Sequence, residues 1–311
     1  MAVSPTPGQM KYAHDNITTT SRDEILVLNV HQEFYLNNWF SMLSLLISLA
    51  GLVGNSLVLW LLGFCIPRNL FSIYMLNLAG ADALFLCFQL MFNIASFFRL
   101  IKNVHMIRVV YYITHMSYTV GMSLLASIST ERCLSVLFPI WYRCQRPKHT
   151  STVVCAVVWA LAGLFWIVLL ILCTLRIDEN ICTSIPLFLF IWFLLLSSVL
   201  CVSSLTLLLR VQCTSQHQQP PKLYLLVMLN VLVFLLCGLP LGIIHFIRYY
   251  NIHDISHWLP WFLACVNSSA NPFIYFFLGR QRHQRKESLR VILQRALGDG
   301  QVLGDGATDS T

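Results

Sequence analysis

The sequence predicts an all-α membrane protein, in which seven transmembrane helices form a bundle and a short amphipathic helix follows the seventh span. Three observations predict this class. Of the 311 residues, 57% are hydrophobic and only 11% are charged, a balance that soluble domains do not show. Seven apolar stretches are long enough to cross a bilayer, for which about 20 residues suffice, and the connections between them are short. The stretches are 38–63, 71–98, 108–138, 151–174, 185–210, 223–248 and 257–279.

The segments outside the spans are assigned from polarity and periodicity. Residues 1–37 are polar and are expected to form an extracellular N-terminal segment without a removable signal peptide, and residues 38–279 form the bundle. In RQRHQRKESLRVILQRAL, apolar residues recur at helical spacing beside a basic face. This pattern predicts an amphipathic helix over 280–297 that lies on membrane lipid. Residues 298–311 are expected to be a disordered cytoplasmic tail.

The distribution of charge predicts the orientation. Most of the 20 Lys and Arg residues fall on one side of the predicted membrane, including Arg132, Arg146 and the basic run after Gly279. Because cytoplasmic loops carry the excess of Lys and Arg, this side is the cytoplasm. The N-terminus then lies outside a multi-pass plasma-membrane protein. Asn16 begins an Asn-Ile-Thr acceptor for N-glycosylation, which agrees with that orientation.

Two of the eleven cysteines differ in position from those inside the spans. Cys173 and Cys182 flank the short loop TLRIDENI on the predicted outer side, where the compartment is oxidising. A disulfide between them would join the ends of the fourth and fifth helices. Two free thiols are the alternative, because spacing alone does not fix connectivity.

The predicted seventh helix contains a polar stripe. Asn267, Asn271 and Tyr275 are spaced by four residues and share one face, with Ser268 beside them. Pro272 has no amide hydrogen to donate and is expected to kink the helix. Since lipid penalises unpaired polar groups, this stripe should face protein or water inside the bundle.

Asp82 is an acid near the middle of the second span, and such a carboxylate is by default a functional residue. One reading of the chain is therefore a transporter or an ion channel that uses Asp82. Transporters more often show inverted repeats and matched broken helices, which this chain lacks. No nucleophile or metal-ligand cluster indicates an enzyme, and nothing indicates a nucleic-acid partner.

Other polar or helix-bending residues lie in the third and sixth spans. Glu131 and Arg132 stand together where the third span meets the membrane boundary. Taken alone, they read as an arginine that reaches the interface with a neighbouring acid as its counter-ion. In the sixth span, Pro240 is expected to kink the helix, and Gly238 removes bulk just before it.

Taken in order, these motifs resemble rhodopsin-like (class A) G-protein-coupled receptors, and longer runs resemble the Mas-related subfamily. The motifs are GNSLV, LNLAGAD, ERC, CGLP and NPFIY; the longer runs include ISTERCLSVLFPIWYRCQRPKHTS and NSSANPFIYFFLGR. The resemblance implies a receptor that passes an extracellular signal to heterotrimeric G proteins, with Gq and Gi as the usual partners. In that subfamily the Cys173 and Cys182 pair looks like the alternative to the common disulfide.

The resemblance also implies roles for residues inside the bundle. Arg132, which follows Glu131, matches the arginine that contacts the G protein, and Asn271, Pro272 and Tyr275 match the motif that rearranges with it. The switch thus comprises Glu131, Arg132, Asn271, Pro272, Tyr275, Gly238 and Pro240. A polar pocket that often holds a sodium ion is matched by Asp82, Asn267, Ser268 and Asn271.

Several positions depart from the pattern of the class. Gly121 replaces a serine that usually lines the sodium pocket, which argues against sodium as an allosteric modulator; no other cofactor is expected. Gly238 replaces the usual tryptophan, the sixth helix begins without an acid, and the fifth helix has no tyrosine. These departures predict a loosely latched receptor with ligand-independent signalling.

Aromatic side chains with polar tips gather near the predicted outer ends of the helices, and they suit a peptide or a small amphiphile. Ordinary core packing accounts for part of this set. The candidates are Tyr111, His115, Tyr118, His245, Arg248, Trp258 and Trp261. Some Mas-related relatives bind cationic peptides through acids, but the matching places here are apolar, around Leu169 and Pro186. An anionic ligand is therefore favoured, although Asp178 and Glu179 in the loop favour a cationic one.

Overall fold

The computed structural model describes residues 38–66, 70–98, 104–147, 149–175, 179–214, 222–249, 258–279, 289–291 and 293. The predictions for the N-terminal segment with Asn16, for the tail 298–311 and for most of the helix at 280–297 lie outside these residues. The described part of 280–297 is helical, with Leu293 buried and Leu289 exposed.

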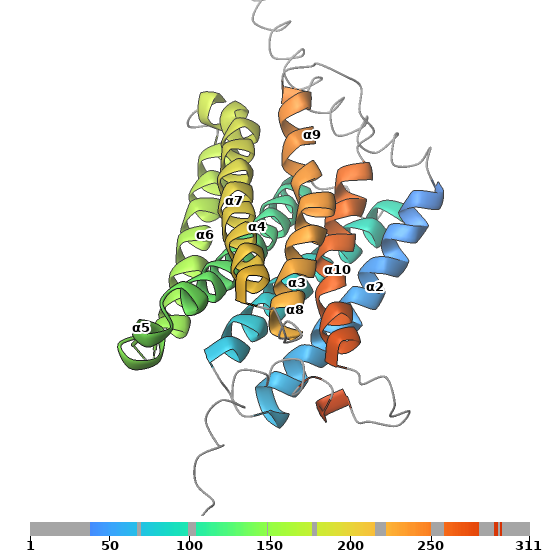
Figure 1. The fold of residues 1–311 in the computed structure, drawn as a ribbon. Helices are drawn as coiled ribbons and strands as arrows, with labels where there is room; N and C mark the ends of the chain where they lie inside the picture. Colours follow the sequence, from blue (N-terminus) through green and yellow to red (C-terminus); the bar gives the residue numbers. More distant parts are fainter. Residues whose placement is uncertain are drawn as a thin grey trace, which may run out of the picture.

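All regular structure in the described residues is helical (Figure 1). The helices are α2 (Asn38–Trp60), α3 (Leu70–Phe97), α4 (Val104–Leu137), α5 (Pro139–Cys144), α6 (Thr150–Thr174), α7 (Glu179–Thr214), α8 (Lys222–Val233), α9 (Leu239–Tyr249) and α10 (Trp258–Gly279). A π-helical turn, Leu61–Cys65, follows α2, and a second one, Phe234–Gly238, joins α8 to α9. The helix bounds match the predicted spans to within about four residues, except that α7 begins at Glu179 rather than at residue 185. The second π-helical turn lies just before Pro240, where a kink was predicted.

Six of the described helical segments are long and apolar enough to cross a membrane. The seventh segment is α10, which carries Asn267, Ser268, Ser269 and Asn271 in its middle. Large apolar side chains cover the outside of the bundle: Leu161, Val202 and Leu236 are all exposed. Such an apolar surface is what contact with lipid requires. The described chain is therefore a seven-helix transmembrane bundle.

α4 runs through the middle of the bundle and packs against α3, α6, α7 and α8, while α10 packs between α2 and α8 (Figure 1). The approach of α2 to α10 is close, because a Cβ atom on Gly54 would lie 2.9 Å from Cγ of Pro272. The end of the bundle that contains Cys173 and Cys182 is called the disulfide end. The end that contains Arg132 and α5 is called the Arg132 end.

Candidate functional site

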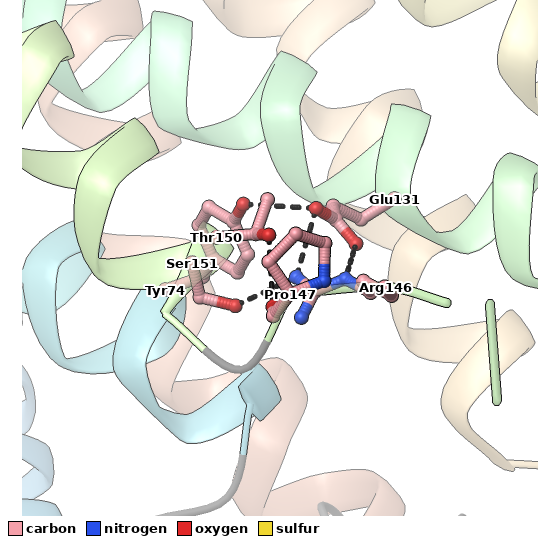
Figure 2. A network of polar contacts seen from close by, with 6 residues as sticks. All are labelled: Tyr74, Glu131, Arg146, Pro147, Thr150 and Ser151. Atoms are coloured by element: carbon pink, nitrogen blue, oxygen red, sulfur yellow. Dashed lines mark hydrogen bonds and ion pairs between the residues drawn. The ribbon is translucent and has the colours of Figure 1, made fainter. Parts of the chain in front are cut away.

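Glu131 is the centre of a polar cluster at the Arg132 end (Figure 2). Arg146 donates from Nη2 to Oε1 of Glu131 over 2.9 Å and from Nε to Oε2 over 3.1 Å. Tyr74 of α3 donates its hydroxyl to the same Oε1 over 3.1 Å. Glu131 therefore joins α4 to α3 and to the connection that follows α5.

Arg146 extends the cluster to α6. Its Nη2 also donates to Oγ of Ser151 over 2.9 Å, and its guanidinium lies 5.1 Å from the ring centroid of Tyr142 on α5. Burial lowers the pKa of Arg146, but the hydrogen bonds with Glu131 together with the nearby charges of Glu131, Tyr142 and Tyr74 outweigh burial, so the pKa is raised. Burial and the charge of Glu131 raise the pKa of Tyr142. The charged guanidinium thus anchors α5 beside α4.

Arg132 follows Glu131 in sequence but contacts a different helix. Its guanidinium carbon lies 4.0 Å from the centroid of the Phe71 ring at the start of α3. This is a cation–π contact, which is stronger where water is excluded, and Phe71 is buried. The sequence suggested Glu131 as the counter-ion of Arg132. The structure instead gives Glu131 a bidentate ion pair with Arg146, a residue that the sequence analysis assigned only to the cytoplasmic side.

The polar stripe of α10 faces the bundle interior, as predicted. Asn271 donates to Oδ2 of Asp82 over 2.6 Å, and Asn267 donates to the sulfur of Met122 over 3.9 Å. From α2, Asn55 donates to the carbonyl oxygen of Ser268 over 3.1 Å. These contacts join α2, α3 and α4 to α10 and satisfy part of the buried polar groups across the bundle. Oδ1 of Asn55 and the hydroxyl groups of Ser268 and Tyr275 have no hydrogen-bond partner.

In the predicted ion pocket, Ser268 and Asn271 lie beside the Asp82 carboxylate, whereas Gly121 offers no side-chain oxygen. One carboxylate oxygen is bound by Asn271, and the other faces Gly121, where an added Cβ would lie 3.4 Å from it. Hard cations require several oxygen ligands, and Gly121 supplies no side-chain oxygen.

Tyr118 and Phe234 fill the space beside Gly238. The Tyr118 hydroxyl donates to the carbonyl oxygen of Gly238 over 3.2 Å. A Cβ atom on Gly238 would lie 2.8 Å from Cδ2 of Phe234 and 3.1 Å from the Tyr118 hydroxyl. The tyrosine, named above as a ligand candidate, therefore packs at the sixth-span bend and also against Phe85 and Phe193.

Nearer the disulfide end, three of the predicted ligand residues lie in one aromatic cluster. The His115 ring lies 3.9 Å from Tyr111 and 5.0 Å from Trp261, centroid to centroid. Trp166 of α6 completes the cluster at 5.4 Å from His115. His115 and Trp166 are buried, so part of this cluster is core. The side chains of the remaining candidates, His245, Arg248 and Trp258, lie outside the described residues.

A disulfide joins Cys173 at the end of α6 to Cys182, with 5.7 Å between their Cα atoms. The prediction of this bond is confirmed. Cys182 lies within the helix rather than in the preceding loop, because α7 already begins at Glu179. The bond therefore fixes the first turns of α7 to the end of α6.

Some residues of these clusters were missed in the sequence. Tyr74 and Trp166 gave no signal, because a tyrosine or tryptophan in an apolar span looks like ordinary packing. Asn230 of α8 was also missed, although the sequence contains a signal for it: Asn230 is an isolated amide in the apolar run KLYLLVMLNVLV. It is buried, and neither of its side-chain polar atoms has a hydrogen-bond partner.

Comparison with known proteins identifies the family to which these polar and aromatic clusters belong. Residues 54–275 match the family model of the 7 transmembrane receptor (rhodopsin family). The chain is 42% identical to Mas-related G-protein coupled receptor member X2 of Pongo pygmaeus, covering 94% of this chain and 92% of the relative. It is 45% identical to member X1 of Homo sapiens, covering 86% and 85%. It is 42% identical to member A1 of Mus musculus, covering 83% and 89%. The chain therefore belongs to the rhodopsin family of seven-transmembrane receptors and, within it, to the Mas-related G-protein-coupled receptors.

Proposed function

We propose that this receptor passes an extracellular signal, carried by a peptide or an amphipathic small molecule, to heterotrimeric G proteins of the Gq or Gi type. In this proposal the disulfide end and the N-terminus face the outside, and the Arg132 end and the C-terminus face the cytoplasm. The switch residues of α4 and α10 connect the two ends. The Glu131 and Arg146 ion pair at the Arg132 end is the observation that carries the proposal.

The ion pair supports G-protein docking because it fixes α5 beside Arg132. Phe138, Ile140 and Trp141 project from this short segment and are 56%, 80% and 43% exposed. An exposed apolar patch rimmed by charges is a typical surface for a protein partner. We infer that α5 and Arg132 together form the G-protein contact, with Arg146 setting the position of α5.

The ligand would bind at the disulfide end, above the aromatic cluster of Tyr111, His115 and Trp261. Two described features support an anionic amphiphile. Leu169, on the α6 face where some relatives use an acid, is buried and apolar. Arg108, near the start of α4, lies close enough to Tyr112 to act on its hydroxyl group. The aromatic rings would contact the apolar part of such a ligand, and Arg108 and Arg248 its charged group.

The docking surface is tested with Ile140→Asp, because a side chain that is 80% exposed can be changed without disturbing the core. GTPγS binding is measured on membranes that contain the receptor and purified Gq or Gi. We expect at least a tenfold loss of coupling, the cost of about 1.4 kcal/mol of lost contact energy. Gln145→Asp is the matched control, since Gln145 is exposed just after α5. Full coupling by Ile140→Asp would exclude α5 from the contact.

The ligand class is tested by calcium release in cells challenged with a pool of anionic amphiphiles or a pool of cationic peptides. Arg108→Ala and Arg248→Ala should each weaken the response to the anionic pool. Arg290→Ala is the charge-matched control, because Arg290 is exposed and follows the seventh span, away from the proposed ligand site. A response to cationic peptides alone would show instead that acids such as Asp178 and Glu179 form the contact.

A further inference from the structure

The polar stripe of α10 is satisfied along most of its length but not at its last member. Asn267 and Asn271 donate to Met122 and Asp82. Tyr275 lies one turn further toward the Arg132 end and is 1% exposed. Its hydroxyl group is buried and makes no hydrogen bond with any protein group. Among the three residues of the stripe, Tyr275 therefore has an unsatisfied polar atom in the bundle interior.

A second unsatisfied group lies on the neighbouring helix. Asn230 of α8 is also 1% exposed, and both Oδ1 and Nδ2 are buried without a hydrogen-bond partner. α8 packs against α10, and the Asn230 side chain lies near enough to the Tyr275 hydroxyl to act on it as a hydrogen-bonding group. The two side chains do not reach the geometry of a direct hydrogen bond, since neither the hydroxyl nor the amide has a partner.

Three buried polar atoms from two neighbouring helices thus lack direct hydrogen-bond partners. An unpaired buried polar group is costly, and more so in a span with no water outside it. Buried waters commonly occupy such places, where each makes about three hydrogen bonds to groups that would otherwise be unsatisfied. A hydroxyl that can donate and accept, next to an amide that can do both, provides the partners that a water molecule requires.

We propose that Asn230 and Tyr275 form a buried water site between α8 and α10, and that the water-bridged contact holds these helices together in the resting receptor. This inference rests on the proposed role of Tyr275 in the switch. α8 carries no acid in its sequence, so it has no carboxylate with which to hold Arg132. Water-bridged hydrogen bonds between uncharged groups connect α8 to α10 instead. These hydrogen bonds have to break when the two helices separate.

The test compares Asn230→Val, Tyr275→Phe and the double variant in full-length receptor. Ligand-independent GTPγS binding is measured with purified G protein and divided by the number of receptors at the surface. Each single variant should raise basal activity about fivefold, the effect of one net hydrogen bond. The double variant should show no further increase, because either change alone removes the bridge. Replacing a buried unsatisfied amide by an apolar group is not expected to impair folding.

Asn93→Val is the matched control. Asn93 is also a buried asparagine with an unsatisfied Nδ2, but it lies on α3 toward the disulfide end. It should leave basal activity unchanged. A high-resolution structure should also show density for water within hydrogen-bonding distance of Asn230 and Tyr275.

Independent effects of the two variants, unchanged basal activity in Asn230→Val, or a dry contact between the side chains would overturn the inference. The proposed function fails separately, since a wild-type receptor that activates neither Gq nor Gi under any condition would contradict it without reference to Asn230.

Discussion

Tyr118 of α4 donates its hydroxyl to the carbonyl oxygen of Gly238 over 3.2 Å, across the bend between α8 and α9. The bond satisfies a carbonyl group in the π-helical turn Phe234–Gly238, where regular helical hydrogen bonding is interrupted. It is possible because residue 238 has no side chain: a Cβ atom there would lie 3.1 Å from the hydroxyl. Tyr118 therefore packs directly against the π-helical turn of the sixth span.

Gly238→Ala should destabilise the receptor. The added Cβ would lie 2.8 Å from Cδ2 of Phe234, and an aromatic ring in a packed core cannot move away freely. We expect a loss of about 1–3 kcal/mol, measured as a lower Tm of the purified receptor, and restoration of part of it by adding Phe234→Leu. Gly163→Ala is the control, because a Cβ at Gly163 meets nothing within 4 Å. Equal Tm values for both alanine variants would contradict the packing described at Gly238.

The sequence predicted the features that depend on residues close together in the chain. The α10 stripe is one of them, because a spacing of four residues places Asn267, Asn271 and Tyr275 on one face whatever the rest of the fold does. The spans were likewise predictable, because bilayer thickness sets their length. The disulfide followed from two cysteines that flank a short loop.

Contacts between distant segments could not be predicted in this way. Glu131 and Arg132 are adjacent, so the sequence suggests that they interact with each other, yet successive helical positions point in different directions. The structure therefore directs Glu131 to Arg146 and Arg132 to Phe71. Tyr118 was predicted as a ligand contact from its aromatic ring alone, and only the packing of α4 against the sixth span reveals its hydrogen bond to Gly238.

The Glu131 and Arg146 pair should behave as a coupled unit in stability measurements. Their side chains are 14% and 3% exposed, so Arg146→Gln or Glu131→Gln alone leaves a poorly solvated charge. We expect each single variant to lose about 3 kcal/mol, seen as a fall in Tm of several degrees. The double variant should lose less than the sum, because neither charge remains unpaired.

Arg146→Lys separates geometry from charge in the same experiment. Lysine keeps the positive charge but cannot form the two parallel hydrogen bonds to the carboxylate, so its Tm should lie between those of the wild type and Arg146→Gln. Strictly additive losses in the double variant would show that the pair contributes no stabilising interaction.

Loss of the disulfide should lower stability by the same amount whichever cysteine is replaced. Cys173 and Cys182 are separated by nine residues in sequence, and a loop of this length corresponds to about 2–3 kcal/mol in the chain-entropy description. Cys173→Ser, Cys182→Ser and the double variant should therefore share one Tm, and a reducing agent should bring the wild type to it. Cys87→Ser, at an exposed free cysteine of α3, controls for the substitution itself. Different Tm values for the two single variants would indicate a role for one thiol apart from the bond.

Agonist affinity should not respond to sodium, and one substitution should introduce a response. The second carboxylate oxygen of Asp82, Oδ1, lies near Gly121, which offers no ligand atom, so replacing NaCl with choline chloride should leave the affinity unchanged. In Gly121→Ser, the Cβ atom fits at 3.4 Å from Oδ1 of Asp82, and its hydroxyl adds the oxygen that a hard cation lacks there. Sodium should then lower agonist affinity by about fivefold or more, a typical coupling between two sites. Radioligand competition in the two salts measures this, with Gly163→Ser as control. Sodium sensitivity already present in the wild type would contradict the assignment, because waters would then complete the ion's coordination without a residue at position 121.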